Sequence, residues 1–592
     1  MKKIILLLAV TATIGFWSCE DYLDRPPLDR IGNDSYWSTA TDFMNYTLQF
    51  YSKFPSFGGG AANYTGIFGY DAFNGSDHAI TGTIPNSTLN GTNTLLATNS
   101  NWNWSNIRSI NIFFENLAKT NVPLSDIKHF IGEAHFFKAW FYFEKVQTFG
   151  DVPWFTNTLQ MNSEELYRPR DSRNIVVDSI LFHLDKAIEN LSKLSDMTSL
   201  GGSNRLSKEA ALAFKSRVAL FEGTWEKYHN GTAFGVPNAD WNKYFRIAVE
   251  AAEELMNGNY KVGIYNKSKP AEDYAYVFSQ EDFSSVNEII LWKQFSVDLG
   301  LGNQFQPFVS GFTATIGLTE NLARNYLSKN GEPINYDELI STQKGKAFLI
   351  ALGDAVDARL SQTIWIPGAL LSDNIHNVNG QPKYFSNPAL NQSGNGFNGT
   401  GFQMRKGVNP YSATAGGPTG TLGNTGGIIF RFAEVLLNYA EAKAELGEPV
   451  DYNKSLNILR RRAGMPNFNK DNVDPNRSSY ADFGYTLTNE LYEIRRERAV
   501  ELATEGFRTM DLFRWAGHNL IKGKRPKGYP FSQTDWGTTK INIPIDESGR
   551  LDPLKKGLPS GYGFNPNRDY LDYIPINEIT LNSKLEQNPG WE

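Results

Sequence analysis

The chain contains one cysteine, Cys19, in 592 residues. A single thiol cannot form a disulfide within its own chain, so buried apolar area has to stabilise the fold instead. Hydrophobic residues make up 41% of the sequence, and a chain of this length can bury a large core. The sequence therefore predicts a globular protein without covalent cross-links.

The position of Cys19 indicates export. Lys2 and Lys3 form a cationic start, residues 4–15 form an apolar run, and Cys19 follows shortly afterwards. A helix needs about 20 residues to span a bilayer, so this run is too short for that and is typical of a secretory signal peptide. A lone cysteine at such a boundary is typical of the lipid-acceptor thiol of a bacterial lipoprotein. We expect residues 1–18 to be a signal peptide and Cys19 to be lipidated; the alternative is an ordinary cleaved signal with an unrelated cysteine.

The charge of the chain argues against nucleic acid as a partner. The formal net charge is −6, and it becomes −8 when Lys2 and Lys3 leave with the signal peptide. An acidic chain has no electrostatic attraction to nucleic acid or to anionic lipid headgroups. Aromatic residues make up 13% of the chain. Most of them are expected in the core, yet such a supply also suits a surface that stacks against sugar rings or peptide side chains.

Seven segments repeat apolar residues with the 3.6-residue period of an α-helix. In one of them Phe432, Val435 and Tyr439 fall on one helical face. In another, Trp140 and Glu144 lie on the same side. The predicted helices are 133–149, 174–194, 207–225, 241–256, 431–446, 452–463 and 487–503.

These helices occur in pairs, and small residues would let neighbouring helices approach closely. Each pair would bury its apolar face only against the next pair, as in tetratricopeptide-like arrays. Two long stretches between the helices, 57–105 and 387–427, are rich in Gly, Asn, Ser and Thr. Loops of this length are usually functional or disordered. Because both stretches retain hydrophobic residues, we expect ordered loops.

Motifs of common enzymes are absent from the sequence. It has no Walker A, nucleophile-elbow or zinc-protease motif. The seven histidines are scattered without the spacing of metal ligands. We therefore expect no catalytic residue, no metal site and no cofactor.

The most highly charged segment is 491–515. Glu497, Glu501 and Glu505 share one helical face, and two such carboxylates could serve as the acid and base of a glycosidase. Glu501 and Glu505 each have an arginine three residues away, and Glu497 stands between two arginines, which favours ion pairs. Arginine partners lower a carboxyl pKa, the wrong direction for a general acid. We therefore interpret these carboxylates as structural, and we interpret the three arginines at 460–462 as a solvated edge with one or two internal pairs.

Several segments, taken together and in order, resemble the SusD/RagB family of surface lipoproteins from Bacteroidetes, and the resemblance runs nearly end to end. Any one of these motifs is weak, but their common order is specific. The segments are Cys19-Glu-Asp-Tyr-Leu-Asp24, Glu133-Ala-His-Phe-Phe-Lys-Ala-Trp-Phe-Tyr-Phe143, Phe149-Gly-Asp-Val-Pro153, Arg205-Leu-Ser-Lys-Glu-Ala-Ala211, Asp357-Ala-Arg359, Arg431-Phe-Ala-Glu-Val-Leu-Leu-Asn-Tyr-Ala-Glu-Ala442, Leu456-Asn-Ile-Leu-Arg-Arg-Arg-Ala-Gly464, Arg495-Arg-Glu-Arg498 with Glu505-Gly-Phe-Arg508, Asp511-Leu-Phe-Arg-Trp515, Ile574-Pro-Ile-Asn-Glu578 and Gln587-Asn-Pro-Gly-Trp591.

The resemblance implies a mainly α-helical protein whose tetratricopeptide-like helix pairs pack against an irregular, loop-rich ligand-binding half. It implies an N-terminal region 19–280 and a C-terminal region 281–592 within one intertwined unit. It also implies capture of a glycan at the cell surface, without catalysis, and delivery to a SusC-type TonB-dependent transporter of the outer membrane. Capture of peptides on the same scaffold is the alternative, and a glycoside hydrolase is a remote one.

In proteins of this family, ligand contacts come from variable loops, so the resemblance only nominates residues. Exposed aromatic rings would stack on sugars, and nearby polar groups would orient the hydroxyls. For each tryptophan the competing interpretation is a core position, and Trp365 is a weaker nominee. The candidates are Asp71, Asp77, His78, Trp102 and Trp104 in the first region, and Trp292, Phe305 and Phe308 in the second.

Replacement of Cys19 by Ala tests the lipid anchor. We expect Cys19→Ala to leave the membrane fraction, because the acyl chains would have no thiol to attach to. Fractionation of cells and mass spectrometry of the purified chain measure this. A Cys19→Ala protein that stays membrane-bound with the mass of the unmodified chain would show that the lipoprotein interpretation is wrong.

Overall fold

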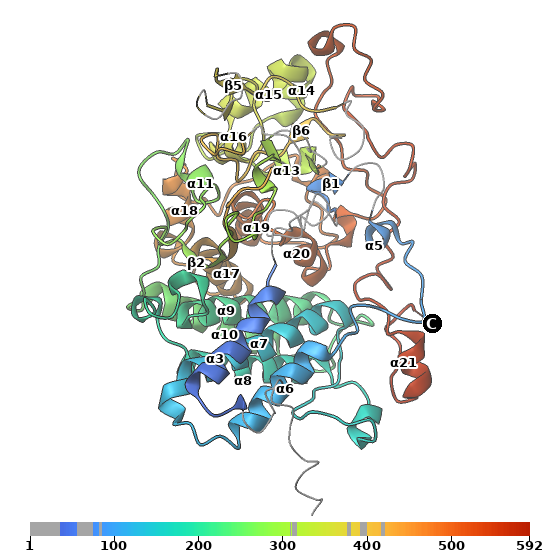
Figure 1. Ribbon diagram of the computed structural model, residues 1–592. Coiled ribbons are helices and arrows are strands. Elements are labelled where there is room, and N and C mark those ends of the chain that lie inside the picture. The colour runs from blue at the N-terminus through green and yellow to red at the C-terminus, as the bar shows by residue number, and fades with distance from the viewer. Residues whose placement is uncertain are drawn as a thin grey trace, which may run out of the picture.

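Figure 1 presents a computed structural model of the chain. The structure describes residues 36–55, 75–81, 86–307, 309–310, 316–373, 375, 380–390, 399–415 and 421–591. Cys19 and the predicted signal peptide lie outside these residues, as do Asp71 and Phe308. Within the described residues, every helix is either too short or too polar to cross a bilayer.

Long helices form one half of the molecule, drawn in blue to green in the lower part of Figure 1. Each packs on the next in sequence, α7 on α8, α8 on α9 and α9 on α10. This consecutive packing confirms the predicted array of helix pairs. The helices are α3 (Ala40–Leu48), α6 (Ser105–Leu117), α7 (Leu124–Phe149), α8 (Arg173–Asn190), α9 (Lys208–Tyr228) and α10 (Trp241–Asn257).

Local signals set the ends of these helices. The Ser207 side chain accepts a hydrogen bond from the Ala210 amide and begins α9, and the Asp240 side chain accepts one from the Lys243 amide and begins α10. Helix α7 ends at Gly150, whose φ of 71° suits a residue without a Cβ. The predicted helix 133–149 is therefore right at its end, but α7 begins nine residues earlier, at Leu124.

Four further helices lie between the long-helix half and the irregular half. They are α17 (Phe432–Glu445), α18 (Leu456–Arg462), α19 (Asn489–Glu501) and α20 (Arg508–Arg514). Helix α17 packs against α9 and α10 on one side and α19 on another. The apolar face predicted for it is only part of its buried surface, because Glu434 and Glu441 are buried too.

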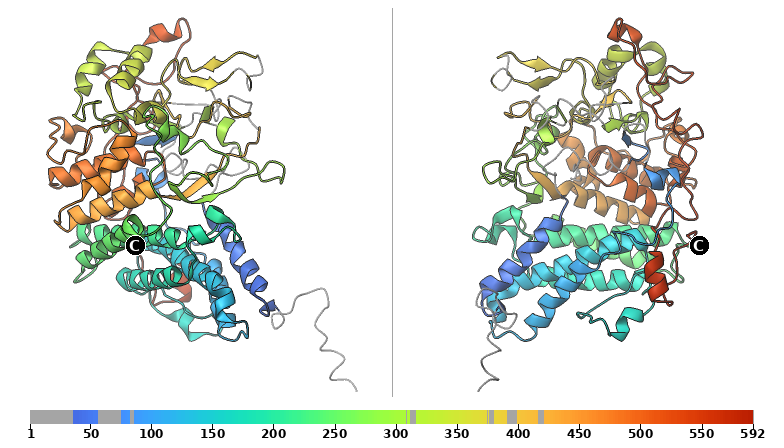
Figure 2. Two further views of the ribbon diagram at one scale, coloured as in Figure 1. Left: turned by 90° about the vertical axis from the view of Figure 1, so that its left-hand side faces the viewer. Right: turned by 45° about the vertical axis from the view of Figure 1, so that its right-hand side comes forward.

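The other half is irregular, with short strands and helices (Figure 2). Strand β2 (Ile289–Lys293) pairs antiparallel with β7 (Gly427–Arg431). A second sheet contains β1 (Ala79–Thr81), β3 (Ile316–Leu318) and β6 (Phe402–Gln403), and β4 (Leu370–Ser372) pairs with β5 (Lys383–Tyr384). The short helices are α5 (Ser87–Asn90), α11 (Asp273–Tyr276), α12 (Phe305–Pro307), α13 (Glu320–Ala323), α14 (Tyr336–Thr342), α15 (Gly345–Ala355), α16 (Arg359–Thr363) and α21 (Ile576–Leu581).

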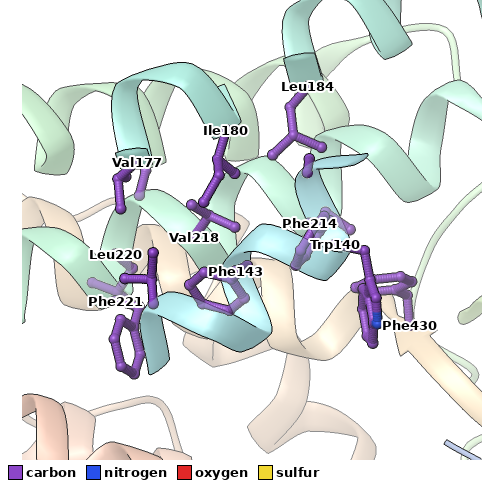
Figure 3. Close-up of a cluster of buried hydrophobic side chains, with 14 of the residues drawn as sticks. Trp140, Phe143, Val177, Ile180, Leu184, Phe214, Val218, Leu220, Phe221 and Phe430 are labelled. Carbon is purple, nitrogen blue, oxygen red and sulfur yellow. The ribbon is translucent and has the colours of Figure 1, made fainter. Parts of the chain in front are cut away.

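Aromatic rings join the two halves (Figure 3). The ring centroids of Trp140 on α7 and Phe214 on α9 are 5.1 Å apart, and that of Phe430 on β7 lies 5.9 Å from Phe214. All three side chains are buried. Strand β7 therefore contributes to the apolar core of the helical half, while its other end reaches the ion pairs described next.

A buried ionic network surrounds α19. It contains five cationic side chains and five carboxylates, so its formal charges balance. Burial of unpaired charges is costly, whereas a balanced, hydrogen-bonded set is tolerated. The members are Arg359, Lys406, Arg431, Arg460 and Arg462 with Glu288, Asp357, Glu497, Glu501 and Glu505.

Arg431 and Glu501 have the most central contacts of this network. Arg431 Nη1 lies 2.9 Å from Glu288 Oε1 and 2.8 Å from Glu501 Oε1, and its Nε lies 2.6 Å from Glu505 Oε2. Burial alone would raise the pKa of Glu501, but the charges of Arg462 and Arg431 reverse this and hold it below its usual range. The carboxylates at 497, 501 and 505 are thus structural, as predicted, although most of their partners are distant in sequence.

The prediction of a solvated edge at residues 460–462 holds only for Arg461, whereas Arg460 and Arg462 form the predicted internal pairs. Arg460 donates to Glu497 across 2.9 Å, and Arg462 donates to Glu501 across 2.6 Å, both in the protein interior. Only Arg461 is exposed. Carboxylates brought in from Glu288 and from α19 compensate these charges, and the local sequence does not show that.

Replacement of Arg431 by Met tests the importance of the network. We expect Arg431→Met to lower the free energy of unfolding by about 3–5 kcal/mol, because buried carboxylates lose their counter-charge. Arg461→Met, next to the network but exposed, should change it by less than about 0.5 kcal/mol. Urea denaturation followed by circular dichroism measures both, and equal stability of the two variants would contradict the proposed role.

Candidate functional site

A cleft of about 840 Å³ opens between the two halves, and its volume is within the range of roughly 300–1,000 Å³ typical of ligand sites. It lies where the start of α6 and the end of α7 approach β7 and the turn after α19. We call it the cleft. Its walls come from residues 52–55, 100–106, 140–148, 214–217, 428–434 and 505–510.

Aromatic rings line one wall of the cleft. Trp140, Phe143 and Phe214 contribute from the buried core, and Phe507 is half-buried. The Trp140 indole donates a hydrogen bond from Nε1 to Glu144 Oε1 across 2.9 Å. The rings are therefore held in place before any ligand arrives, which lowers the ordering entropy that binding has to overcome.

Two amide side chains in the cleft are available to a ligand. Asn106 and Gln147 are half-exposed, and within the described part of the chain neither amide side chain hydrogen-bonds to protein. An amide offers two donors and one acceptor, which matches the paired donor and acceptor character of a sugar hydroxyl. These residues can orient a polar ligand without first breaking internal contacts.

Glu144 and Lys145 add ionisable groups to the same wall. Both line the cleft, where Glu144 is exposed and Lys145 is half-exposed. The loss of hydration raises the pKa of Glu144 to about 7 and lowers the pKa of Lys145 to about 8. Lys145 Nζ donates to the Asn101 carbonyl and so attaches the loop before α6 to α7.

Apart from the exposed Lys53, the remaining charges in the cleft are already paired. Arg217 donates to both oxygens of Glu434, across 2.6 and 2.7 Å. Arg431 and Glu505, both members of the ionic network, form part of the cleft's lining. The cleft therefore has two parts. In one part the charges are fixed and neutralised by ion pairs, and in the other, around α7 and the start of α6, polar groups are free.

A second cavity of about 310 Å³ lies on the other side of the segment 102–105. We call it the tryptophan pocket. Trp102, Trp104 and Phe155 line it together with Leu166 and Leu585, and it also contains the Arg108 guanidinium. The predicted residues Trp102 and Trp104 are thus brought together, with ring centroids 5.2 Å apart. Trp102 is only 8% exposed, so most of its ring belongs to the core.

Asp77 and His78 lie in the interior. Arg508 forms two hydrogen bonds to Asp77, of 2.8 and 2.6 Å. Burial alone would raise the pKa of Asp77, but the Arg508 charge lowers it. Burial and that same charge lower the pKa of His78 to about 3, so this imidazole is neutral. In this arrangement Asp77 links β1 to α20 and is not presented to a ligand.

The second predicted region is also in the core. Trp292 on β2 is 1% exposed, and its Nε1 donates to Ser203 Oγ across 2.8 Å. Phe305 is buried, and Trp365 is fully buried against Phe385. These residues belong to a partly apolar strand and to the glycine-rich loop next to it, and such a sequence does not show which aromatic rings face the core. The structure therefore leaves these three side chains out of both cavities.

Sequence reasoning did not nominate Asn106, Gln147, Glu144 or Lys145. The sequence did contain one indication of a site at Glu144. Its carboxyl falls among aromatic residues on one side of the helix, and a charged group is unusual on such an apolar face. The two amides carry no such signal, because polar residues at a helix start are ordinary. Among the described residues, no group of three or more His, Cys, Asp or Glu side chains is arranged to hold a metal ion.

Two family models match the chain. The model described as the SusD family matches residues 290–591, which is more than half of the sequence. The model described as "Starch-binding associating with outer membrane" matches residues 59–220. Together they include α6, α7, α8 and the helices α17–α20, and most of the segments that form the cleft.

Known proteins with similar sequences and structures agree with these matches. The chain is 23% identical to SusD-like protein P38 of Formosa agariphila over 549 residues, which is 87% of this chain and 91% of that protein. A SusD-like carbohydrate-binding protein from Bacteroides fragilis superimposes with a TM-score of 0.70 at 22% identity, over 93% of this chain and 100% of that one. A laminarin-binding SusD-like protein superimposes with a TM-score of 0.56 at 19% identity, over 94% and 100%.

The ordered motifs, the helix pairs beside an irregular half, and the match of the C-terminal half to the family model agree with one another. They also confirm the family that the sequence resembled. The chain belongs to the SusD family, a family of carbohydrate-binding proteins associated with the outer membrane.

Proposed function

We propose that this protein is a lipid-anchored protein of the cell surface that captures oligosaccharides or polysaccharides in the cleft and delivers them to a SusC-type TonB-dependent transporter. The observation that carries this proposal is the cleft of a SusD-family chain, where two free amide groups and the polar ends of Glu144 and Lys145 stand beside fixed aromatic rings. Sugars present apolar ring faces and many hydroxyls, so they require this combination of groups.

Weak binding is expected and suits delivery. A solvated glycan has to lose water from many hydroxyls, and the cleft is open on one side, so we expect dissociation constants of roughly micromolar to millimolar. A ligand held much more tightly would pass slowly to a transporter. The laminarin-binding neighbour and the starch-binding family description make β-glucan and starch the first glycans to test.

A hydrolase is the less favoured class. Hydrolysis of a glycoside requires two carboxyl groups facing the scissile bond. Glu434 and Glu505 line the cleft, but each is held by arginine partners. Glu144 therefore has no second free carboxylate among the described residues of the cleft wall. Release of shorter products from a bound glycan, abolished by Glu144→Gln, would favour the hydrolase.

Capture of peptides on the same scaffold is the other alternative. Peptides also carry apolar groups and hydrogen-bonding groups, so the cleft chemistry admits them. A panel of soluble glycans and of mixed peptides, offered to the protein from Glu20 onward, separates the two. Binding of peptides without binding of any glycan would replace the proposed ligand class.

Removal of the two free amides tests the cleft. The double variant Asn106→Ala with Gln147→Ala should weaken binding of laminarin or starch about tenfold, since each lost hydrogen bond contributes about 0.5–1.5 kcal/mol. The melting temperature should stay nearly unchanged, because neither amide bonds to the protein. Isothermal titration calorimetry measures the affinity.

The matched control is Asn257→Ala with Gln160→Ala, which removes two exposed amides away from both cavities. This control should bind as the unmodified protein does. Equal affinity of the cleft variant and the control would place the glycan elsewhere.

The pH dependence of binding tests Glu144 separately. The pKa of its carboxyl is raised to about 7, so the group is largely neutral at pH 6 and largely ionised at pH 8. A hydrogen bond to an ionised group is stronger than one to a neutral group by about 1 kcal/mol. The unmodified protein should therefore bind its glycan about fivefold more tightly at pH 8 than at pH 6. Lys145, whose pKa is about 8, also loses charge over part of this range, so Glu144→Gln should keep only the change in affinity that is due to Lys145. An unchanged pH dependence in that variant would exclude Glu144 from the site.

A further inference from the structure

The cleft and the tryptophan pocket meet at one exposed residue. Ser105 lines both cavities, and it is the first residue of α6. Asn101 and Asn103, in the segment leading to it, are exposed and line the cleft. Trp102 and Trp104 alternate with them and line the pocket. The segment 101–105 is therefore a thin partition with one cavity on each side.

Trp104 is the main side chain of this partition. On one side, Lys145 Nζ of the cleft wall lies 5.8 Å from its ring centroid. On the other side, the ring centroid of Phe155 from the pocket wall lies 5.5 Å away. A single indole thus separates the two cavities, and a ligand that passes over Ser105 would contact both.

The partition is fixed from behind by the C-terminal segment. Asn99 Nδ2 donates to Asp572 Oδ2 across 2.8 Å, and the Tyr573 hydroxyl donates to the Thr98 carbonyl across 3.3 Å. The Asn577 amide donates to the Ala97 carbonyl across 3.1 Å. A segment bound in this way does not move aside easily, so both cavities persist on either side of it.

The tryptophan pocket has the chemistry of a sugar site. Its apolar wall includes two indoles, a phenyl ring and leucines. Arg108 uses one Nη to donate to the Leu159 carbonyl, and Glu578 also lines the pocket. Within the described residues, the Glu578 side chain forms no ion pair or hydrogen bond with the protein. Apolar faces with a few free polar groups are what a glycan ring requires.

We infer that the tryptophan pocket is a second subsite for the same glycan chain, so that the protein selects chains long enough to pass from the cleft over Ser105 into the pocket. This inference rests on the proposed function of the cleft. The ligand class it names is an oligosaccharide or polysaccharide chain, in preference to a mono- or disaccharide, which would fill one cavity only.

The test compares chain lengths and blocks one cavity. Laminari-oligosaccharides and malto-oligosaccharides, each from disaccharide to octasaccharide, are titrated calorimetrically against the full mature chain. Affinity should rise once the chain is long enough to reach the second cavity. Leu166→Arg should obstruct the pocket, because Leu166 is 40% exposed at its rim and can be replaced without disturbing the core.

Leu166→Arg should weaken binding of the longest oligosaccharide about tenfold and leave binding of the shortest bound one unchanged. Leu124→Arg, at an exposed leucine outside both cavities, is the matched control and should change neither. Melting curves confirm that both variants remain folded. A second obstruction, Glu578→Trp, should repeat the loss.

The outcomes separate the two proposals. If short and long chains bind equally and neither obstruction matters, the second subsite does not exist, although the proposed function stands. If the obstructions weaken short and long chains alike, the ligand lies in the tryptophan pocket alone, and the spanning chain is excluded. If neither series binds at all, both the subsite and the proposed glucan capture are wrong.

Discussion

The fold depends on the balance of charge around α19. Ten charged side chains are removed from water there, and they come from β7, α18, α16 and the residues before it, α19 and the turn after it, the loop after β6 and the residue before β2. Removal of one charge would leave its partner buried without compensation, which costs far more than the pair contributes. The ion pairs therefore fix one arrangement of the irregular half around α19, although its short strands alone would specify the fold only weakly.

This constraint extends to the cleft. Arg431 and Glu505 belong both to the network and to the cleft lining. Because they are fully paired, they offer a ligand a rigid surface and no free charge. The groups that are free, such as Asn106 and Glu144, stand on α6 and α7 and belong to the helical half. The site thus combines a rigid surface, made by the ion pairs around α19, with polar groups of the helical half that can bind a ligand.

The sequence predicts the helices well because their signal is local. The start of α9 after Ser207 and that of α10 at Trp241 follow from caps and periodicity within a few residues. The network at Arg460 and Arg462 could not be predicted, since Glu288 is more than 170 residues away in sequence. The exposure of the aromatic candidates could not be predicted for a related reason, because Trp292 is buried beside residues distant in sequence, such as Ser203, while Trp104 lines a cavity.

The contacts of the C-terminal segment have a consequence for the order of folding. Asn588 accepts a hydrogen bond from Arg170 and donates one to the Phe149 carbonyl, across more than 400 residues of sequence. Pairings of such separation form late, because the entropy of closing a long loop has to be overcome first. The helical half can pack before the whole chain has been synthesised. The loop at 97–105, in contrast, becomes ordered only after residues 572–577 have formed their contacts with it. A protein that enters a new compartment unfolded would therefore form its helical scaffold first and its binding surface afterwards. Chains truncated before the C-terminal segment would fold in part but would not bind ligand.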